Sequence, residues 1–271
     1  MDELFHLVYP NRPLGFSEYG AEGMPNLHSA HPRRGDHTEE YQAKYHEYML
    51  KCFDRHPWLW ATHVWNMFDF AADARDQGGE PGMNHKGLVT FDRKTKKDSF
   101  YLYKAWWSEE NFVHICSKRF TDRTEKEIKV KVYSNQNTVA LYADGKKLAE
   151  QTGEHIFKFR VPLHGKVELK AVAGDCIDTA SFCNVAEPNP SYKLVKTKSK
   201  SANWYKQGHS AVWRLLYMKR RRTNEYQKTQ STFVVGAHCA DGDFDHRRHR
   251  GQHDRKSVRH HPERCSECID L

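Results

Sequence analysis

The chain has 271 residues, 38% of them hydrophobic and 13% aromatic, so it holds enough apolar side chains to bury a core. Its net charge of +8 is unevenly placed: residues 1–192 hold 25 Lys and Arg against 27 Asp and Glu, and residues 193–271 hold 18 against 8. The positive charge belongs to the tail, so it gives no reason to expect a nucleic-acid partner for the rest of the chain.

The seven cysteines are an odd number and lack the dense spacing of a disulfide scaffold, which favours free thiols in a reducing compartment. No stretch approaches the roughly 18–20 apolar residues of a membrane span, and the first residues, Met1-Asp2-Glu3, do not open a signal peptide. The expected location is cytoplasmic, without a membrane partner.

The first predicted element is a buried strand in residues 12–20, an apolar run bounded by Pro and Gly that ends in a loop. A helix follows, with Asp36 and Glu39 placed as a capping box and Pro57 as its end. One face of this helix is marked by residues at a spacing of three or four: Tyr41, Tyr45, Tyr48, Met49, Cys52 and Phe53.

The nearly continuous apolar and aromatic run of residues 58–68 predicts a parallel strand buried on both faces. A polar, Gly-rich loop occupies residues 74–87, and residues 98–107 predict a short capped helix. Strand, helix, strand and helix in this order are typical of an α/β barrel, in which functional side chains sit at the C-terminal ends of strands.

After residue 123 the hydrophobic period changes to two, which predicts strands. Residues 139–149 form a predicted hairpin with its turn at Asp144-Gly145. The other predicted strands are residues 128–133, 156–161, 167–172 and 176–182. About six short strands over some sixty residues favour a small immunoglobulin-like sandwich.

The expected fold class is therefore α/β plus all-β, with an α/β part in residues 1–112, a sandwich in 113–192 and a disordered basic tail in 193–271. The change of composition at the tail suggests a shifted reading frame. Its Cys265-x-x-Cys268 pair beside His260 and His261 lacks the separated ligand pairs of a structural zinc site, so no metal is expected.

Glu18 is the first candidate for chemistry. It is an acid at the C-terminal end of a predicted strand, and Gly20 allows an open loop after it. On its own, an acid in a loop is more often a solvated surface residue, so the context of Glu18 has to decide.

That context is a family resemblance. Five motifs resemble, in order, the last third of the catalytic (β/α)8 (TIM) barrel of glycoside hydrolase family 2, and the likeness covers roughly residues 10–190. The motifs are PLGFSEYGAEG (residues 13–23), LHS (27–29), VWNMFDFA (64–71), NHKGLVTFDRK (84–94) and FYLYKA (100–105). The resemblance implies the C-terminal portion of that barrel followed by an immunoglobulin-like sandwich.

It also implies an enzyme, a retaining glycosidase in which Glu18 is the nucleophile. The family's acid/base follows an Asn-Glu pair well upstream of the nucleophile, and only seventeen residues precede Glu18. The chain is thus expected to be a fragment that lacks this acid and is inactive alone. Asn224-Glu225, in the tail, is a coincidence, and Glu22 is expected to be structural.

The same resemblance implies substrate-binding roles for Trp65, Asn84 and Lys86. Trp65 stands where the family places an aromatic floor beneath the sugar. Asn84 and Lys86 form the Asn-x-Lys pair that contacts the sugar carboxylate in β-glucuronidases. Because the surrounding residues look more like the β-galactosidase branch, a terminal β-D-galactoside is the favoured substrate and a β-glucuronide the alternative.

Two readings from other classes stay open. The chain could be a non-catalytic carbohydrate-binding module, or a nucleic-acid binder through the basic run of residues 219–222. No cofactor is expected. The expected partners are the carbohydrate substrate and either the missing N-terminal half or a second copy in a homo-oligomer.

Overall fold

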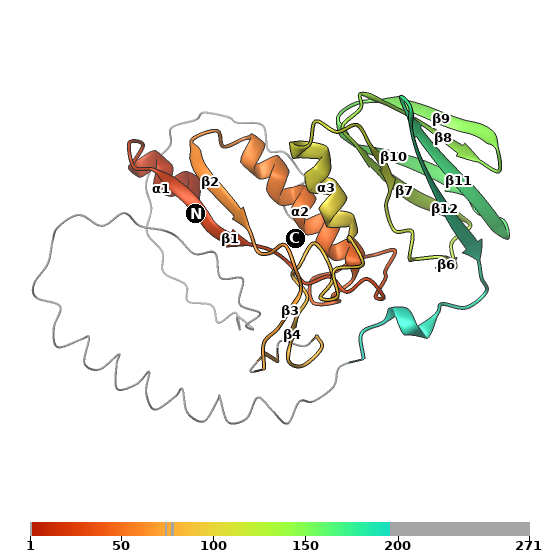
Figure 1. Cartoon of the computed structure of the whole chain (residues 1–271), viewed down its shortest axis with the longest axis horizontal. Helices are drawn as coiled ribbons and strands as arrows, with labels where there is room; N and C mark the ends of the chain where they lie inside the picture. Colours follow the sequence, from red (N-terminus) through yellow and green to blue (C-terminus); the bar gives the residue numbers. More distant parts are fainter. Residues whose placement is uncertain (1, 74, 77–78, 196–271) are drawn as a thin grey trace, which may run out of the picture. The chain divides into compact units, whose positions relative to one another are not determined.

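The computed structural model describes residues 2–73, 75–76 and 79–195, and the fold of these residues is mostly β with few helices (Figure 1). The predicted disordered tail lies outside the described residues apart from its first three positions. The Cys265-x-x-Cys268 pair lies outside them too.

The helices of the described residues are α1 (Asp2–Val8), α2 (Glu39–Asp54), α3 (Asp98–Trp107) and the short 3-10 helix η1 (Pro190–Tyr192). The strands are β1 (Leu14–Tyr19), β2 (Leu59–Val64), β3 (Phe70–Ala71), β4 (Met83–Asn84), β5 (Val113–Ile115), β6 (Asp122–Arg123), β7 (Glu127–Ser134), β8 (Thr138–Ala143), β9 (Lys146–Thr152), β10 (His155–Pro162), β11 (Lys166–Ala173) and β12 (Cys176–Asn184). The predicted helix 98–107 is confirmed with the same bounds, but the predicted cap is wrong, because the N-cap residue Lys97 makes no side-chain capping bond. Within this described part, no helix has the length and apolar character needed to cross a membrane.

Strands β1 and β2 pair in parallel, with Tyr19 opposite Val64, and α2 lies between them in the chain. This strand–helix–strand order is the one expected from the alternation of patterns. The complete (β/α)8 barrel, to which the two strands are expected to belong, stays a prediction.

The expectation of one strand over residues 58–68, buried on both faces, is wrong. Strand β2 ends at Val64, its side chains are half-buried or exposed, and Trp60 is 64% exposed. After Val64 the chain leaves β1, because Asn66 and Met67 hydrogen-bond to the loop that follows β4. Leu88 N donates to Asn66 O at 3.0 Å, and Val89 N donates to Met67 O at 2.9 Å. The aromatic run therefore divides into a strand and a loop segment.

The capping-box interpretation of Asp36 and Glu39 is also wrong. The N-cap of α2 is Thr38, whose Oγ1 accepts from Tyr41 N at 3.1 Å. Asp36 supports the preceding turn by accepting from Thr38 N at 2.9 Å, and Glu39 accepts from Asp98 N at 2.7 Å. Glu39 is thus committed to a tertiary contact and does not close its own helix end.

The aromatic face predicted for α2 is only half-buried, because the fully buried face of this helix is largely polar. The fully buried residues are Glu39, Glu40, Gln42, Ala43, His46 and Leu50. His46 bonds Tyr103 Oη through Nδ1 at 2.8 Å. Burial and the nearby charge of Lys97 lower the pKa of His46 to about 3, so its ring is neutral at pH 7.

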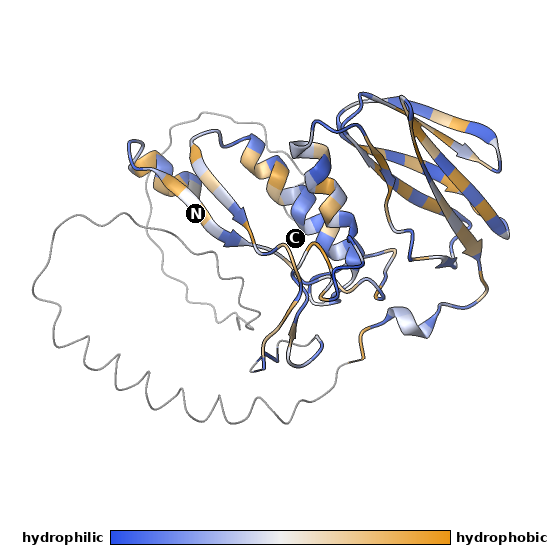
Figure 2. Ribbon diagram, viewed as in Figure 1, coloured by the Kyte–Doolittle hydropathy of each residue, from blue (hydrophilic) through white to orange (hydrophobic). Residues whose placement is uncertain are grey.

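The strands after α3 form two sheets. Their orders are β10-β7-β5 and β6-β12-β11-β8-β9. All six predicted strands are present, and the turn at Asp144-Gly145 has the positive φ angles, 48° and 79°, of a tight hairpin. Hydropathy alternates along these strands (Figure 2), and their inward side chains, such as Val132, Leu141 and Leu169, form one core. The immunoglobulin-like connection of the strands stays a prediction.

A second core lies around α2 and α3, and it includes side chains from the sheets. Leu50 and Leu102 pack there with Tyr133 of β7 and with the half-buried Ile156 of β10. Glu47 of α2 accepts hydrogen bonds from Lys131 and from the hydroxyl of Tyr133. The helices and the β7–β10 sheet therefore share buried surface.

Candidate functional site

The C-terminal ends of β1 and β2 place Glu18 and Trp65 at one edge of the parallel pair. Trp65 N donates to Tyr19 O at 2.7 Å, directly after the half-buried Glu18. A Cβ on Gly20 would lie 1.9 Å from Trp65 O, so this close passage of the two backbones requires glycine. Two of the four predicted site residues are thus brought to adjacent strand ends.

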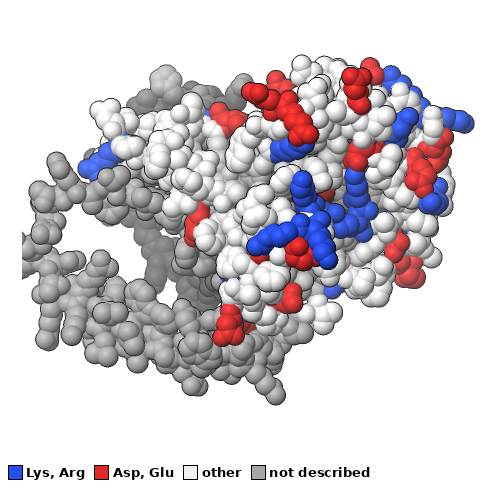
Figure 3. All heavy atoms as spheres, in the orientation of Figure 1, with Lys and Arg blue, Asp and Glu red and all other residues white. Residues whose placement is uncertain are grey.

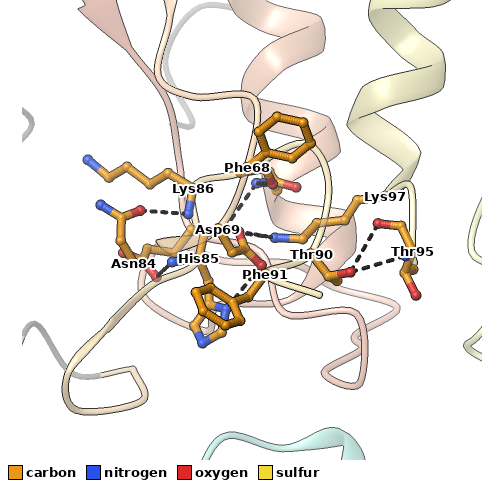
Figure 4. A network of polar contacts seen from close by, with 12 residues as sticks. Phe68, Asp69, Asn84, His85, Lys86, Thr90, Phe91, Thr95 and Lys97 are labelled. Carbon is orange, nitrogen blue, oxygen red and sulfur yellow. Dashed lines mark hydrogen bonds and ion pairs between the residues drawn. The ribbon is translucent and has the colours of Figure 1, made fainter. Parts of the chain in front are cut away.

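The loop of Asn84 and Lys86 joins the same edge. Asn66 N, next to Trp65, donates to Lys86 O at 3.4 Å, and Leu88 N returns a bond to Asn66 O at 3.0 Å. Asn84 is 3% exposed and its Oδ1 accepts from Lys86 N at 2.9 Å. The side chains of Asn84 and Lys86 extend to the same side of the loop, away from Lys97 (Figure 4). The structure therefore gathers all four predicted site residues in one region.

Trp65 retains an accessible ring. The side chain is 41% exposed, and the edge of Phe70 contacts it with ring centroids 6.0 Å apart. An indole held from one side and open on the other offers apolar contact to the C–H face of a sugar ring.

An ion pair that the sequence analysis missed lies beneath the loop. Lys97 is fully buried, and its Nζ donates to Asp69 Oδ1 at 2.8 Å and to His85 O at 3.0 Å. Burial lowers the pKa of Lys97, while the charge of Asp69 opposes that shift. The backbone carbonyl of His85, between Asn84 and Lys86, therefore accepts a hydrogen bond from the buried Lys97.

His85 connects this pair to the protein surface. Its Nδ1 lies 3.3 Å from Asp69 Oδ2, and its Nε2 lies 2.9 Å from Glu80 Oε2. Burial alone would lower the pKa of His85, but the hydrogen bonds to Asp69 and Glu80 and the Asp69 charge raise it. The carboxylates at both ring nitrogens therefore fix the orientation of the His85 side chain, and His85 lies between Asn84 and Lys86 in the chain.

Glu22 has a structural position, as expected. It accepts hydrogen bonds from the guanidinium of Arg75 and, at 3.1 Å, from His85 N, and His37 Nδ1 lies 3.7 Å away. Burial would raise the pKa of Glu22, but these partners hold it at about 2. Glu22 is therefore a carboxylate at neutral pH and links the loop after β1 to the loop of His85.

A buried group with metal-ligand chemistry lies at the start of α3. Ligand atoms of Asp98, His114 and Cys116 all lie within 4.8 Å of one another. Asp98 accepts from His114 Nε2 at 2.9 Å and from Ser117 N at 2.7 Å, and burial raises the pKa of the Cys116 thiol. These hydrogen bonds hold Asp98 and His114 together at the start of α3.

One face of the described residues carries mixed charge. Figure 3 shows Lys and Arg gathered near the middle of one face, with Asp and Glu around and among them. On this face the two signs are therefore interspersed, so it presents no broad field of one sign.

No family model matches the sequence. The chain is 36% identical over 156 residues to the β-glucuronidase of Bacteroides fragilis, a match that covers 55% of this chain and 22% of that protein. The crystal structure of an FMN-binding β-glucuronidase from Facaelibacterium prausnitzii L2-6 is 49% identical, with a TM-score of 0.69, and covers 71% of this chain and 30% of that one. A putative β-galactosidase from Bacteroides fragilis is 35% identical, with a TM-score of 0.64, over 69% and 30% of the two chains.

These similar proteins are glycosidases, and this chain spans less than one third of their length. The name β-glucuronidase is more frequent among them than β-galactosidase, so the galactosidase branch is not singled out. The likeness agrees with the coarser resemblance to part of a family 2 glycoside hydrolase.

Proposed function

We propose that the chain supplies the nucleophile side of a retaining β-glycosidase, with Glu18 as the nucleophile. The observation that carries the proposal is the meeting of Glu18, Trp65 and the Asn84–Lys86 loop at the ends of β1 and β2. In a retaining mechanism the nucleophilic carboxylate attacks the anomeric carbon, and a second carboxyl group about 5–5.5 Å away protonates the leaving oxygen.

We infer that another segment or polypeptide supplies the proton donor of this mechanism. Glu22, the carboxyl group nearest to Glu18 in sequence, is unsuited because Arg75 and His85 hold it as a carboxylate. A general acid must be protonated near neutral pH, so a group with a pKa of about 2 cannot serve. The expected N-terminal half of the barrel, or a second polypeptide, would supply it.

Within the glycosidases we favour a β-glucuronide as substrate, which reverses the preference stated for the sequence. Asn84 Oδ1 accepts from Lys86 N, so the edge of this largely buried amide that remains for a ligand is its N–H edge, on the same side as the Lys86 ammonium (Figure 4). One cation and one amide donor on the same side suit a carboxylate better than a neutral hydroxyl group. Most of the similar proteins are named β-glucuronidases, which also favours a glucuronide.

A β-galactoside is the second candidate, supported by the residues around the Asn-x-Lys pair and by the putative β-galactosidase among the similar structures. A module that binds sugar without chemistry is the third. The cytoplasmic location and the partner half stay predictions of the sequence.

The test uses covalent labelling. A Bacteroides uniformis β-glucuronidase similar to this chain has been crystallised covalently bound to cyclophellitol-6-carboxylate aziridine. We expect this reagent to label Glu18 of a chimera in which this chain replaces the matching segment of the B. fragilis relative, and peptide mass spectrometry locates the adduct. Glu18→Gln removes the anionic nucleophile and should abolish both labelling and hydrolysis of an aryl β-glucuronide.

Glu154→Gln is the matched control, since it neutralises a carboxylate outside this site and should leave labelling intact. Hydrolysis of an aryl β-galactoside in preference to the glucuronide selects the second candidate. Full activity of the Glu18→Gln chimera refutes the assignment of the nucleophile. Sugar binding with no turnover and no label supports the binding module.

A further inference from the structure

Gln42 of α2 bonds both loops of the candidate site, the loop after β1 and the loop that holds Asn84 and Lys86. Its side chain is fully buried, and its Nε2 donates to Ala21 O at 3.0 Å and to Gly87 O at 3.2 Å, with His85 O at 3.4 Å. Ala21 follows Glu18 by three residues, and Gly87 follows Lys86 directly. One amide group therefore contacts both the backbone after the nucleophile and the backbone beside the sugar-binding pair.

The acceptor side of the same amide is fixed as well. Gln42 Oε1 accepts from Ser99 Oγ in α3 at 2.8 Å, which sets the amide orientation so that the NH₂ group faces the loops. A Cβ on Gly23 would lie 2.6 Å from Gln42 Cβ, so the glycine makes room for this side chain. Gln42 thus has one orientation, determined by partners on three chain segments.

The three carbonyl groups depend on Gln42 to different degrees. His85 O also accepts from Gly23 N and from Lys97 Nζ, both at 3.0 Å, so it stays anchored without the glutamine. Gly23 N and Glu22 also bond His85 directly, so the two loops are joined without the glutamine as well. What Gln42 adds is the link between Ala21 O and Gly87 O. Removing the amide therefore loosens Ala21 and Gly87 relative to each other, while the direct bonds of Gly23 and Glu22 to His85 remain.

We propose that Gln42 is a positioning residue that sets the distance between Glu18 and the Asn84–Lys86 pair, and so determines selectivity for a sugar with a carboxylate at C6. The inference rests on the proposed function and extends it from the residues that touch the sugar to one that does not. The reacting carbon and the C6 group are fixed to one sugar ring, so a change in loop spacing lets a ligand satisfy only one of the two contacts. A sugar without the carboxylate loses little by that change.

The test compares methyl β-D-glucuronide with methyl β-D-glucoside, which differ only at C6, by NMR titration of the full 271-residue chain. We expect the wild-type chain to bind the glucuronide about tenfold more tightly, the effect of a charge-assisted contact. Gln42→Met, similar in shape but without donors, should reduce this preference to less than about threefold and leave glucoside binding within about twofold. Gln151→Met is the matched control, since Gln151 also bonds backbone groups, Lys158 N and O, and should keep the wild-type preference.

A second variant gives a pH readout that general loss of stability would not produce. Gln42→Glu places a carboxylate against the carbonyl oxygens at pH 8, whereas the protonated acid at pH 5 regains a donor of nearly the same shape. The glucuronide preference of this variant should recover as pH falls, while that of Gln42→Met should not.

Each outcome separates the two claims. A preference retained in Gln42→Met, or an equal loss of both sugars, overturns the positioning role. A wild-type chain that binds the two sugars equally, or binds neither of them, overturns the choice of a glucuronide and removes the selectivity that Gln42 is proposed to set. A wild-type preference that disappears in Gln42→Met, with the control unchanged, supports both.

Discussion

Lys97 Nζ lies 2.8 Å from Asp69 Oδ1, and the two side chains are 0% and 2% exposed. A buried ion pair adds little net stability when intact, because both charges lost water on folding. Breaking it from one side is costly, since the remaining charge is left buried. Lys97 also donates to His85 O, so the loss of the ion pair would disturb the loop that holds Asn84 and Lys86.

Lys97→Met should therefore destabilise the protein by about 3–5 kcal/mol, measured by urea denaturation. Lys166→Met is the control: Lys166 pairs with Glu168 on the surface, with both side chains more than half exposed, and its loss should change little. Equal effects of the two substitutions would contradict a special role for the buried pair.

Gly20→Ala should destabilise the protein by about 1–3 kcal/mol, because the new methyl group meets the backbone oxygen of Trp65 and not a movable side chain. A crystal structure of the variant, or its circular dichroism in the aromatic region, should show that the ends of β1 and β2 are displaced. Gly153→Ala offers a comparison, since its Cβ would meet only Phe157 Cε1 at an ordinary 3.7 Å. A neutral Gly20→Ala would show that the two strand ends lie farther apart than described.

Glu22 should make stability depend on acid pH. Its pKa is about 2 in the folded chain against 4.5 for the free side chain, so its contribution is present above pH 4.5 and is lost as pH falls toward 2. The shift corresponds to about 3 kcal/mol. Glu22→Gln should lose stability at pH 7 and flatten the acid limb of the unfolding free energy, whereas Glu154→Gln, at an exposed position, should leave both unchanged.

The sandwich should be the most protected part of the chain. Ile128, Val132 and Leu169 are at most 1% exposed, within a core built from the two sheets alone. Hydrogen exchange followed by mass spectrometry should find the slowest amides in β7 and β11. Uniformly fast exchange in those strands would refute a self-contained core.

The sequence predicts the sandwich strands well because their side chains alternate between core and solvent, a pattern held within each strand. It predicts α3 to the residue for a similar reason. The short strands β3 to β6 are missed, since two or three residues show no period. The buried face of α2 is missed because its polar residues, such as Gln42 and His46, bond partners that are distant in the sequence, including Gly87 and Tyr103.

The same division holds for the candidate site. Glu18, Trp65, Asn84 and Lys86 follow from the motif resemblance, and the structure brings them together. The residues beneath them carry no local signal of their role. Polar residues at helical spacing, such as Glu39, Gln42 and His46, were the one available sign that α2 faces a polar interior.

The shared packing of Tyr133 and Ile156 with α2 and α3 has a consequence for synthesis. The ribosome completes both helices before it translates β7 and β10, so the nascent chain exposes the surface that those strands later cover. The helices cannot finish packing while residue 156 is still in the exit tunnel. We therefore expect chaperones to bind the exposed surface of α2 and α3 during translation and to release it once β10 has left the ribosome.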